Sequence, residues 1–308
     1  MKYTKQDLKI MQAWNLERKI QVTQTRIIEW YQHFDGQVYV SFSGGKDSTV
    51  LLDLARRIYP DIEAVFVDTG LEYPEIREFV KTFDNVAWIK PEKTFDKIIA
   101  EYGYPVISKE TSKKIRQIKN PNVGDRYRTA MLYGDERGNY TKIAEKWKKL
   151  LDAPFDCSEQ CCEFMKKKPF AKHEKLSRKK PISGQMAFES RGREKIWLER
   201  GCNAFEGRSM SNPMGFWTEQ DVFQYLKLTE IPYCKIYGEI IKVVHENSLM
   251  LKMTGLGRTG CMFCMFGVHL EKEPNRFQQM KETHPKQYDY CINKLGCGKV
   301  LDYIGVKY

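Results

Sequence analysis

A short polar segment between two apolar repeats has the residue types of an anion-binding loop. The segment reads Ser-Gly-Gly-Lys-Asp-Ser and comprises Ser43, Gly44, Gly45, Lys46, Asp47 and Ser48. A strand that leads through two glycines into a helix presents free backbone N–H groups and the positive end of the helix dipole at one point. The glycines permit close approach, the serines add hydroxyl donors, and the lysine adds a charge that we expect to face solvent. The sequence therefore predicts a phosphate-binding loop.

The loop is not a Walker loop. Lys46 is followed by Asp47 in place of Ser or Thr, and the earlier glycine that a Walker loop requires is missing. Asp47 has two interpretations. Its carboxylate either caps the helix that follows or contacts Mg²⁺ beside the bound phosphate.

Four of the nine cysteines have the spacing of metal ligands. Cys161 and Cys162 are adjacent, and Cys261 and Cys264 form a Cys-x-x-Cys pair. Thiolates in two close groups indicate either a Cys₄ zinc site or an iron-sulfur cluster. Adjacent cysteines fit two corners of one small tetrahedron poorly, whereas a cubane offers four separate iron corners. We therefore favour a [4Fe-4S] cluster over structural zinc and over core cysteines that bind no metal.

A further thiol near the end of the chain is a candidate nucleophile. Cys297 is followed by Gly298 in a segment with little sign of a core, which predicts a mobile thiol with a catalytic role. Cys291 lies six positions earlier and is placed to resolve an intermediate formed on Cys297. The alternative is that both cysteines pack under a C-terminal helix.

Apolar periodicity predicts the elements that position these residues. Strands expected at 37–42, 62–68 and 86–90 alternate with helices expected at 47–58 and 73–83, a pattern typical of a parallel sheet with crossover helices. The predicted fold class is α/β, with a doubly wound, mostly parallel sheet. A basic, irregular insertion is expected at about 109–180, followed by a strand at 181–188 and a helix at 218–228.

We expect three parts in the chain. Residues 1–35 form a helical N-terminal arm, residues 36–230 a nucleotide-binding α/β domain that contains the basic insertion, and residues 231–308 a Cys-rich segment packed on the same domain.

Composition limits the class of protein and its partners. Of 308 residues 42% are hydrophobic, which is sufficient for a buried core, and 51 Lys and Arg exceed 40 Asp and Glu by 11 charges. A positive surplus suits acidic partners such as nucleotides or nucleic acid. No apolar run reaches the roughly 20 residues that span a bilayer, and the N-terminus lacks the apolar core of a signal peptide. These features predict a cytoplasmic protein without a membrane partner.

The order of the motifs resembles a known family. The segment SFSGGKDSTVLL is similar to the loop of the ATP pyrophosphatase (PP-loop) superfamily, and VFVDTGLEYPE is similar to the Asp-Thr-Gly segment of its phosphoadenosine phosphosulfate (PAPS) reductase branch. Further along, SGQMAFESRGRE and NPMGFWTEQDVFQYLKLTEIPYCKIYGE resemble later motifs of that branch. The resemblance covers roughly residues 35–270 and implies a fold like that of the adenine nucleotide alpha hydrolases.

The resemblance implies roles for particular residues. Lys46 and the loop would hold the pyrophosphate of ATP, because members that bind ready-made sulfonucleotides usually lack the Lys-Asp-Ser ending. Asp68 and Thr69 would lie near the adenosine. The Glu-Ser-x-x-Arg motif of the family adds Glu189, Ser190 and Arg193 to the nucleotide-binding residues.

The pattern around Cys161 and Cys162 resembles a second known signature. Cys-Cys-x-x-x-Lys-x-x-Pro is similar to the cluster signature of adenylylsulfate (APS) reductases, in which Lys166 would contact an anion. Two features depart from the reductases. Met186 stands where an Arg usually precedes the Glu-Ser pair, and the residues around Cys297 lack the Glu and His of the reductase tail.

These observations favour one hypothesis and leave two others open. In the favoured hypothesis an iron-sulfur ATP pyrophosphatase adenylates an acceptor, such as nucleic acid, and then transfers sulfur from a donor such as a cysteine desulfurase. DNA phosphorothioation sulfur-transfer proteins are the similar enzymes. The second hypothesis is an APS or PAPS reductase that releases sulfite with a thioredoxin-like donor. The third is a zinc-stapled nucleic-acid-binding module.

Overall fold

The computed structural model describes residues 2–135, 138, 142–245 and 248–308. The chain forms two compact units, each built from separate stretches of sequence. The first unit comprises Met1–Asp68, Glu72–Ile89 and Phe170–Thr259, and the second comprises Thr69–Leu71, Lys90–Pro169 and Gly260–Tyr308. The boundaries expected near residues 35 and 230 divide the chain differently and stay a prediction.

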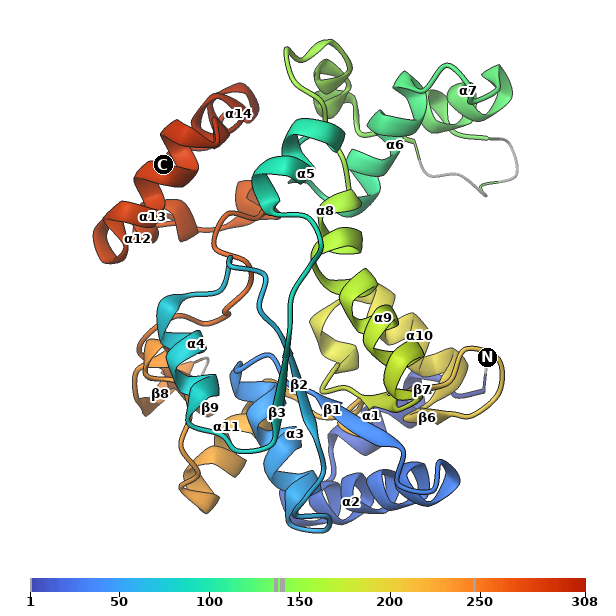
Figure 1. Ribbon diagram of the computed structural model, residues 1–308, viewed down its shortest axis with the longest axis vertical. Helices are drawn as coiled ribbons and strands as arrows, with labels where there is room; N and C mark the ends of the chain where they lie inside the picture. The colour runs from blue at the N-terminus through green and yellow to red at the C-terminus, as the bar shows by residue number, and fades with distance from the viewer. Residues whose placement is uncertain (1, 136–137, 139–141, 246–247) are drawn as a thin grey trace. The chain divides into compact units, whose positions relative to one another are not determined.

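A six-stranded sheet forms the centre of the first unit. Its strand order is β3-β2-β1-β5-β7-β6, and every neighbouring pair is parallel except β6 with β7. The strands are β1 (Val38–Ser41), β2 (Ala64–Val67), β3 (Val86–Ile89), β5 (Lys180–Ile182), β6 (Asn203–Ala204) and β7 (Met210–Ser211). Figure 1 shows β1, β2 and β3 side by side in blue and cyan. The predicted α/β class with a mostly parallel sheet is confirmed.

The strand order identifies the edge at which a ligand is expected. From β1 the chain builds outward through β2 and β3, and it then returns to place β5 on the other side of β1. Open parallel sheets bind ligands at the carboxyl ends of the strands where the order reverses in this way. The segments that follow β1 and β5 therefore meet at the expected binding edge.

Helices pack around this sheet and bury apolar faces. They are α1 (Lys5–Gln12), α2 (Leu16–His33), α3 (Lys46–Arg56), α4 (Pro74–Lys81), α10 (Arg191–Arg200) and α11 (Glu219–Thr229), and α9 (Lys168–Ser177) lies in this unit from Phe170 onward. A hairpin of β8 (Ile240–His245) and β9 (Ser248–Met253) completes the unit. The helix predicted after the phosphate loop is α3, in which Val50, Leu51 and Leu54 are fully buried.

The N-terminal helices belong to the core of the first unit. The buried Lys19 side chain of α2 donates hydrogen bonds to Asp221 Oδ2 at 2.6 Å and to the Gln12 carbonyl at 2.7 Å. Trp217 Nε1 donates to Thr23 Oγ1 at 2.8 Å. The helices expected at 4–34 are therefore present as α1 and α2, and they are tied to α11 and the segment before it.

The second unit is mainly helical. Its helices are α5 (Phe95–Tyr102), α6 (Lys109–Lys119), α7 (Asp125–Tyr133), α8 (Gln160–Cys162), α12 (Arg276–Thr283), α13 (Pro285–Asp289) and α14 (Cys297–Ile304). Two short parallel strands, β4 (Val106–Ile107) and β10 (Met265–Phe266), join the stretch 90–169 to the stretch 260–308. Two π-helical turns, Glu163–Lys167 and Tyr290–Lys294, and a 3₁₀ segment, Glu145–Asp152, lie between the helices.

Two local expectations were wrong. The segment 109–180 is not irregular, because apolar residues such as Ile115, Met131 and Leu150 are buried and order it into helices. The strand expected at 181–188 is confined to Lys180–Ile182, and Ala187–Glu189 forms a 3₁₀ turn. In the described ranges, none of the helices has the length and apolar character needed to cross a bilayer.

Candidate functional site

The phosphate loop has the backbone that its glycines predict. Gly44 has φ +70°, and a Cβ on it would lie 2.7 Å from Val80 Cγ2 and 2.9 Å from Ile76 Cγ2. Ser48 Oγ donates to the Gly45 carbonyl at 2.9 Å and lies 2.9 Å from Ser43 Oγ. The serine hydroxyls therefore fix the turn between β1 and α3.

Gly44→Val should lower both thermal stability and nucleotide binding. The new side chain would collide with Val80 and Ile76 and would force a β-branched residue into a left-handed backbone, which costs about 1–3 kcal/mol for the backbone alone. Thermal denaturation and binding of a fluorescent ATP analogue measure the two effects. Gly207→Val is the matched control, because Gly207 lies in the same unit and also has positive φ, but a Cβ there meets no atom within 4 Å. Equal loss of nucleotide binding in both variants would contradict the predicted role of the loop.

Lys46 is buried within the site, so the expectation that it faces solvent was wrong. Its side chain is 5% exposed, and Nζ lies 3.3 Å from both Asp47 Oδ1 and Glu219 Oε1. The rings of Phe223 and Tyr237 each have centroids 5.9 Å from Nζ. Two carboxylates and two rings thus hold the ammonium group at the start of α3.

Tyr237 closes the loop from a distant part of the sequence. Its hydroxyl accepts a hydrogen bond from the Lys46 backbone N–H at 3.3 Å and also bonds the Thr259 hydroxyl. Burial raises the pKa of Tyr237, so the hydroxyl is neutral at physiological pH. Tyr237 lies at the end of the family-like segment 212–239, and Thr259 lies in the Gly-rich segment TGLGRTG, but the sequence did not single out either residue as a partner of the loop.

Asp47 does not cap the helix. The N-cap of α3 is Gly45, which has no side-chain cap, and Asp47 lies in the first turn. Asp47 Oδ1 is buried and accepts no hydrogen bond, although Lys46 Nζ is its ion-pair partner. A buried carboxylate oxygen of this kind fits a hard cation such as Mg²⁺.

Glu189, Ser190 and Arg193 lie together at the start of α10. Ser190 is the N-cap, and its hydroxyl accepts from the Arg193 N–H at 3.3 Å. Glu189 forms ion pairs with Arg193 and with Arg258, the latter at 3.0 Å. Burial lowers the pKa of Arg193, the charge of Arg258 lowers it further, and the charge of Asp47 raises it. Arg193 and Arg258 are thus positioned near the phosphate loop, and Arg258 had not been predicted.

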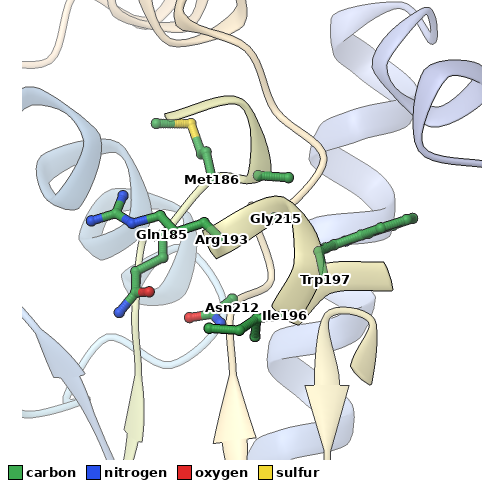
Figure 2. Close-up of a pocket in the computed structure, with 8 residues that line it drawn as sticks. Gln185, Met186, Arg193, Ile196, Trp197, Asn212 and Gly215 are labelled. Carbon is green, nitrogen blue, oxygen red and sulfur yellow. The ribbon is translucent and has the colours of Figure 1, made fainter. Parts of the chain in front are cut away.

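Met186, which stands where the reductases usually have an Arg, lines a small pocket beside Arg193. Gln185, Met186 and Arg193 line a cavity of about 10 Å³, which has room for about one water molecule. Figure 2 shows these three side chains. Met186 is 1% exposed, and its backbone N–H donates to Glu189 Oε2 at 3.1 Å. Met186 therefore packs in the core and orients Glu189 through its backbone.

Asp68 and Thr69 follow β2. The Asp68 carboxylate pairs with Arg77 at 2.9 Å, and its backbone N–H donates to the Ile89 carbonyl at 2.8 Å. Thr69 belongs to the second unit, where its hydroxyl accepts from the Leu71 N–H at 3.1 Å. Their predicted place near the adenosine stays a prediction.

The four predicted metal ligands come together in the second unit. Burial raises the pKa of Cys161, and the charges of Cys261, Cys162 and Cys264 raise it further, so the two pairs of cysteines interact electrostatically. Burial and the charge of Cys261 raise the pKa of Cys264 to about 11. Of the residues the structure describes, no three His, Cys, Asp or Glu are arranged to hold a metal ion.

A single metal ion and an iron-sulfur cluster require different distances between their thiolate ligands. A tetrahedral ion with metal–sulfur bonds of about 2.3 Å needs its thiolates within about 4 Å of one another. A cubane cluster places each thiolate on a separate iron, so its ligands lie farther apart. One buried and three half-buried thiols that interact without forming a single-ion arrangement are compatible with the cluster.

A π-helical turn follows the adjacent cysteines. Cys161 and Cys162 lie in α8, and Glu163–Lys167 adopts the π conformation that is often found at functional sites. The exposed Lys166 lies in this turn, and its charge lowers the pKa of Cys161. Arg276 Nη1 donates to the Cys264 carbonyl at 3.0 Å. Lys166 and Arg276 therefore lie beside the four cysteines.

The expectation of a mobile Cys297 was wrong. Cys297 begins α14 and is fully buried, because Val300, Leu301 and Ile304 continue its face into the core. Cys291 is also fully buried, and a hydrogen bond with Cys297 together with burial raises its pKa. The alternative of two cysteines packed under a C-terminal helix describes this arrangement.

Comparisons with known proteins agree with the motif order. The phosphoadenosine phosphosulfate reductase domain matches residues 37–121 and 123–297. An uncharacterized protein of Methanocaldococcus jannaschii is 25% identical over 281 residues, which are 91% of this chain and 53% of that protein. The chain thus spans about half the length of this relative.

Two named enzymes are also similar. An adenosine 5'-phosphosulfate reductase of Staphylococcus epidermidis is 26% identical over 220 residues, which cover 69% of this chain and 70% of the enzyme. The crystal structure of the PAPS reductase from Candida auris matches with a TM-score of 0.41 and 12% identity, over 81% of this chain and 98% of that one.

Proposed function

The chain belongs to the phosphoadenosine phosphosulfate reductase family, and on that premise we propose that it cleaves ATP to AMP and pyrophosphate and transfers sulfur to an acceptor. The observation that carries this proposal is the arrangement of Lys46 and Asp47 at the start of α3. Lys46 supplies a fixed positive charge, and Asp47 supplies a buried carboxylate oxygen without a hydrogen bond. Such a pair suits a pyrophosphate leaving group with its Mg²⁺ better than it suits a sulfonucleotide.

The chemistry follows from the charges at the loop. An acceptor oxygen attacks the α-phosphorus of ATP, the bond between this phosphorus and the bridging oxygen breaks, and pyrophosphate leaves. Lys46, the backbone N–H groups of the loop and the Mg²⁺ held by Asp47 would stabilise the charge that develops on the leaving group. Arg193 and Arg258 would neutralise the remaining phosphate. A sulfur nucleophile then displaces AMP from the acceptor.

The four thiols would hold the [4Fe-4S] cluster of this proposal. Cys161, Cys162, Cys261 and Cys264 are buried or half-buried and supply four soft ligands in one unit. When bound, the cluster supplies redox chemistry or a reactive sulfur. The chain's own contribution is Lys166, which would hold an anionic group near the thiols, whereas Arg276 pairs with Glu271 and donates to the Cys264 carbonyl.

The proposed setting is the cytoplasm, with nucleic acid as the acceptor and a cysteine desulfurase as the sulfur donor. The sequence surplus of 11 positive charges supports an acidic acceptor.

A second candidate function is sulfonucleotide reduction. The similarity to an adenosine 5'-phosphosulfate reductase over 69% of the chain favours it. Anaerobically purified protein incubated in parallel with ATP, APS and PAPS separates the two. Release of AMP and pyrophosphate from ATP supports our proposal, whereas sulfite from APS or PAPS replaces it. Zinc without iron and without nucleotide turnover would favour a nucleic-acid-binding module.

Cys297→Ser should split ATP at the parental rate but lose sulfur transfer. Adenylation requires the loop and not this thiol, whereas a persulfide relay through Cys297 requires the first turn of α14 to open, because the thiol is buried. Mass spectrometry should find an addition of about 32 Da on Cys297 of the parent after incubation with a desulfurase, whereas about 80 Da after incubation with APS would indicate a reductase. Full sulfur transfer by the variant would leave Cys297 with a packing role alone.

A further inference from the structure

A large pocket lies beside the adjacent cysteines in the second unit. It measures about 540 Å³, within the range of ligand sites. One wall is the start of α6 with Lys109 and Lys113, and the other is the segment from Glu159 to Lys167 with Cys162. No residue of the phosphate loop contributes to it. The pocket is therefore a candidate site for a second ligand.

Two lysines of the pocket form no ion pair within the described residues, although the charge of Lys113 acts on Glu159. Its three carboxylates each pair with a cation: Glu110 with Lys114 at 2.6 Å, Glu159 with Arg116 at 2.5 Å and Glu163 with Lys167 at 3.0 Å. Lys109 and Lys113 are exposed, and neither forms an ion pair with a residue that the structure describes. They lie four residues apart on α6, hence on one face of the helix. The pocket thus presents two neighbouring ammonium groups to an oxyanion.

The surroundings of the pocket are also basic. The described residues between 109 and 152 include eleven Lys and Arg against five Asp and Glu, a surplus of six positive charges. The helix α7 packs against α6 and exposes Tyr127 and Tyr133 at 55% and 66%. Lys148 Nζ lies 4.7 Å from the centre of the Tyr133 ring. Lysines beside exposed aromatic rings are typical of surfaces that bind single-stranded nucleic acid through its phosphates and unpaired bases.

We propose that the pocket between α6 and Cys162 binds a phosphate group of a single-stranded nucleic acid through Lys109 and Lys113, with α7 contacting neighbouring bases. This inference rests on the proposed function, because it assigns a binding site to the acceptor of that reaction. A strand bound here lies beside Cys162. The half-buried thiol belongs to the four-cysteine group, so the acceptor would be held next to the proposed cluster ligands.

The test is binding of a fluorescent single-stranded oligonucleotide to the metal-replete protein, measured by anisotropy at several salt concentrations. The double variant Lys109→Gln/Lys113→Gln should weaken binding at least tenfold and reduce the salt slope by about 1.4, since each lost phosphate contact contributes about 0.7 for single strands. Lys272→Gln/Lys286→Gln is the matched control. It removes two exposed lysines of the same unit that do not line the pocket, and it should bind like the parent.

Binding measurements with other ligands test whether the ligand is a single-stranded nucleic acid. Inorganic phosphate that binds the parent but not the double variant, while both bind the oligonucleotide equally, would overturn the nucleic-acid assignment. A duplex of the same length that binds as tightly as the single strand would also overturn it. If the control variant weakens oligonucleotide binding as much as Lys109→Gln/Lys113→Gln does, the binding is due to diffuse charge attraction. That result would reject the pocket as the binding site.

Binding of a fluorescent ATP analogue to the same samples separates this inference from the proposed function. The Lys109→Gln/Lys113→Gln variant should keep ATP binding, because neither lysine belongs to the phosphate loop. If ATP does not bind to the parent, the proposed function fails while strand binding still tests the pocket. If ATP binds and the double variant binds the strand normally, only the pocket assignment fails.

Discussion

Lys46→Ala should reduce the cleavage of ATP to AMP and pyrophosphate at least about 100-fold, the effect typical of removing one group that stabilises transition-state charge. The substitution removes the one loop side chain with a positive charge and leaves Asp47 and Glu219 facing the phosphate site without their partner. Two unpaired carboxylates repel an anion, so the affinity for ATP should fall together with the rate. Pyrophosphate release and binding of a fluorescent ATP analogue measure the two effects.

Two further variants serve as controls for the Lys46→Ala result. Lys81→Ala removes an exposed lysine of the first unit that pairs with Glu78, and it should leave turnover unchanged. The double variant Lys46→Ala/Glu219→Gln removes one of the unpaired carboxylates, and it should recover part of the ATP affinity but not the rate. Circular dichroism and thermal denaturation establish that each variant is folded. Parental turnover by folded Lys46→Ala protein would reject the phosphate-loop assignment.

The turn from β1 into α3 was predictable because its determinants are contiguous, whereas its binding of phosphate stays a prediction. A buried strand, two glycines and an amphipathic helix follow one another within residues 38–56, and each imposes its own local geometry. The parallel sheet was predictable for a related reason, since β1, α3, β2, α4 and β3 alternate along the chain. The strand order reverses at β1 because β5 pairs with β1, and this reversal marks the expected binding edge. The sequence did not predict which strand pairs with β1 on that side.

The partners of the loop were not predictable by the same reasoning. Glu219, Tyr237 and Arg258 reach the site as single residues from positions more than 170 residues after Lys46. Glu219 and Tyr237 lie in the family-like segment 212–239 and Arg258 lies in TGLGRTG, but neither pattern indicates that these side chains reach the loop. The burial of Lys46 was missed for this reason, because the residues that bury it are distant in sequence.

The C-terminal helix was only the alternative to a mobile segment, although its signal was present. Cys297, Val300, Leu301 and Ile304 recur at helical spacing, and all four are buried in α14. The Cys-Gly pair had been interpreted as the mark of a mobile segment. Gly298 instead lies inside the helix, where a Cβ would approach Ile292 Cγ2 to 2.9 Å, so close packing accounts for this glycine.

Cys161→Ser should abolish the broad visible absorbance of an iron-sulfur protein and lower thermal stability. Cys161 is the more buried of the adjacent pair, and its thiol interacts with the three other cysteines of the group. These cysteines come from both stretches of the second unit, 90–169 and 260–308, so a group bound by all four would tie the stretches together. Iron counted per chain after anaerobic purification measures the loss directly.

Cys157→Ala provides the matched control for this prediction. Cys157 is also buried in the second unit, four residues before Cys161, but burial raises its pKa to about 12 and no charge of the four-cysteine group acts on it. The control should therefore keep its iron and its absorbance. Cys202 and Cys234 lie in the first unit and should be dispensable for the same reason. Parental iron content in Cys161→Ser would exclude this thiol as a ligand, and bound zinc without iron in the anaerobic parent would reject the cluster itself.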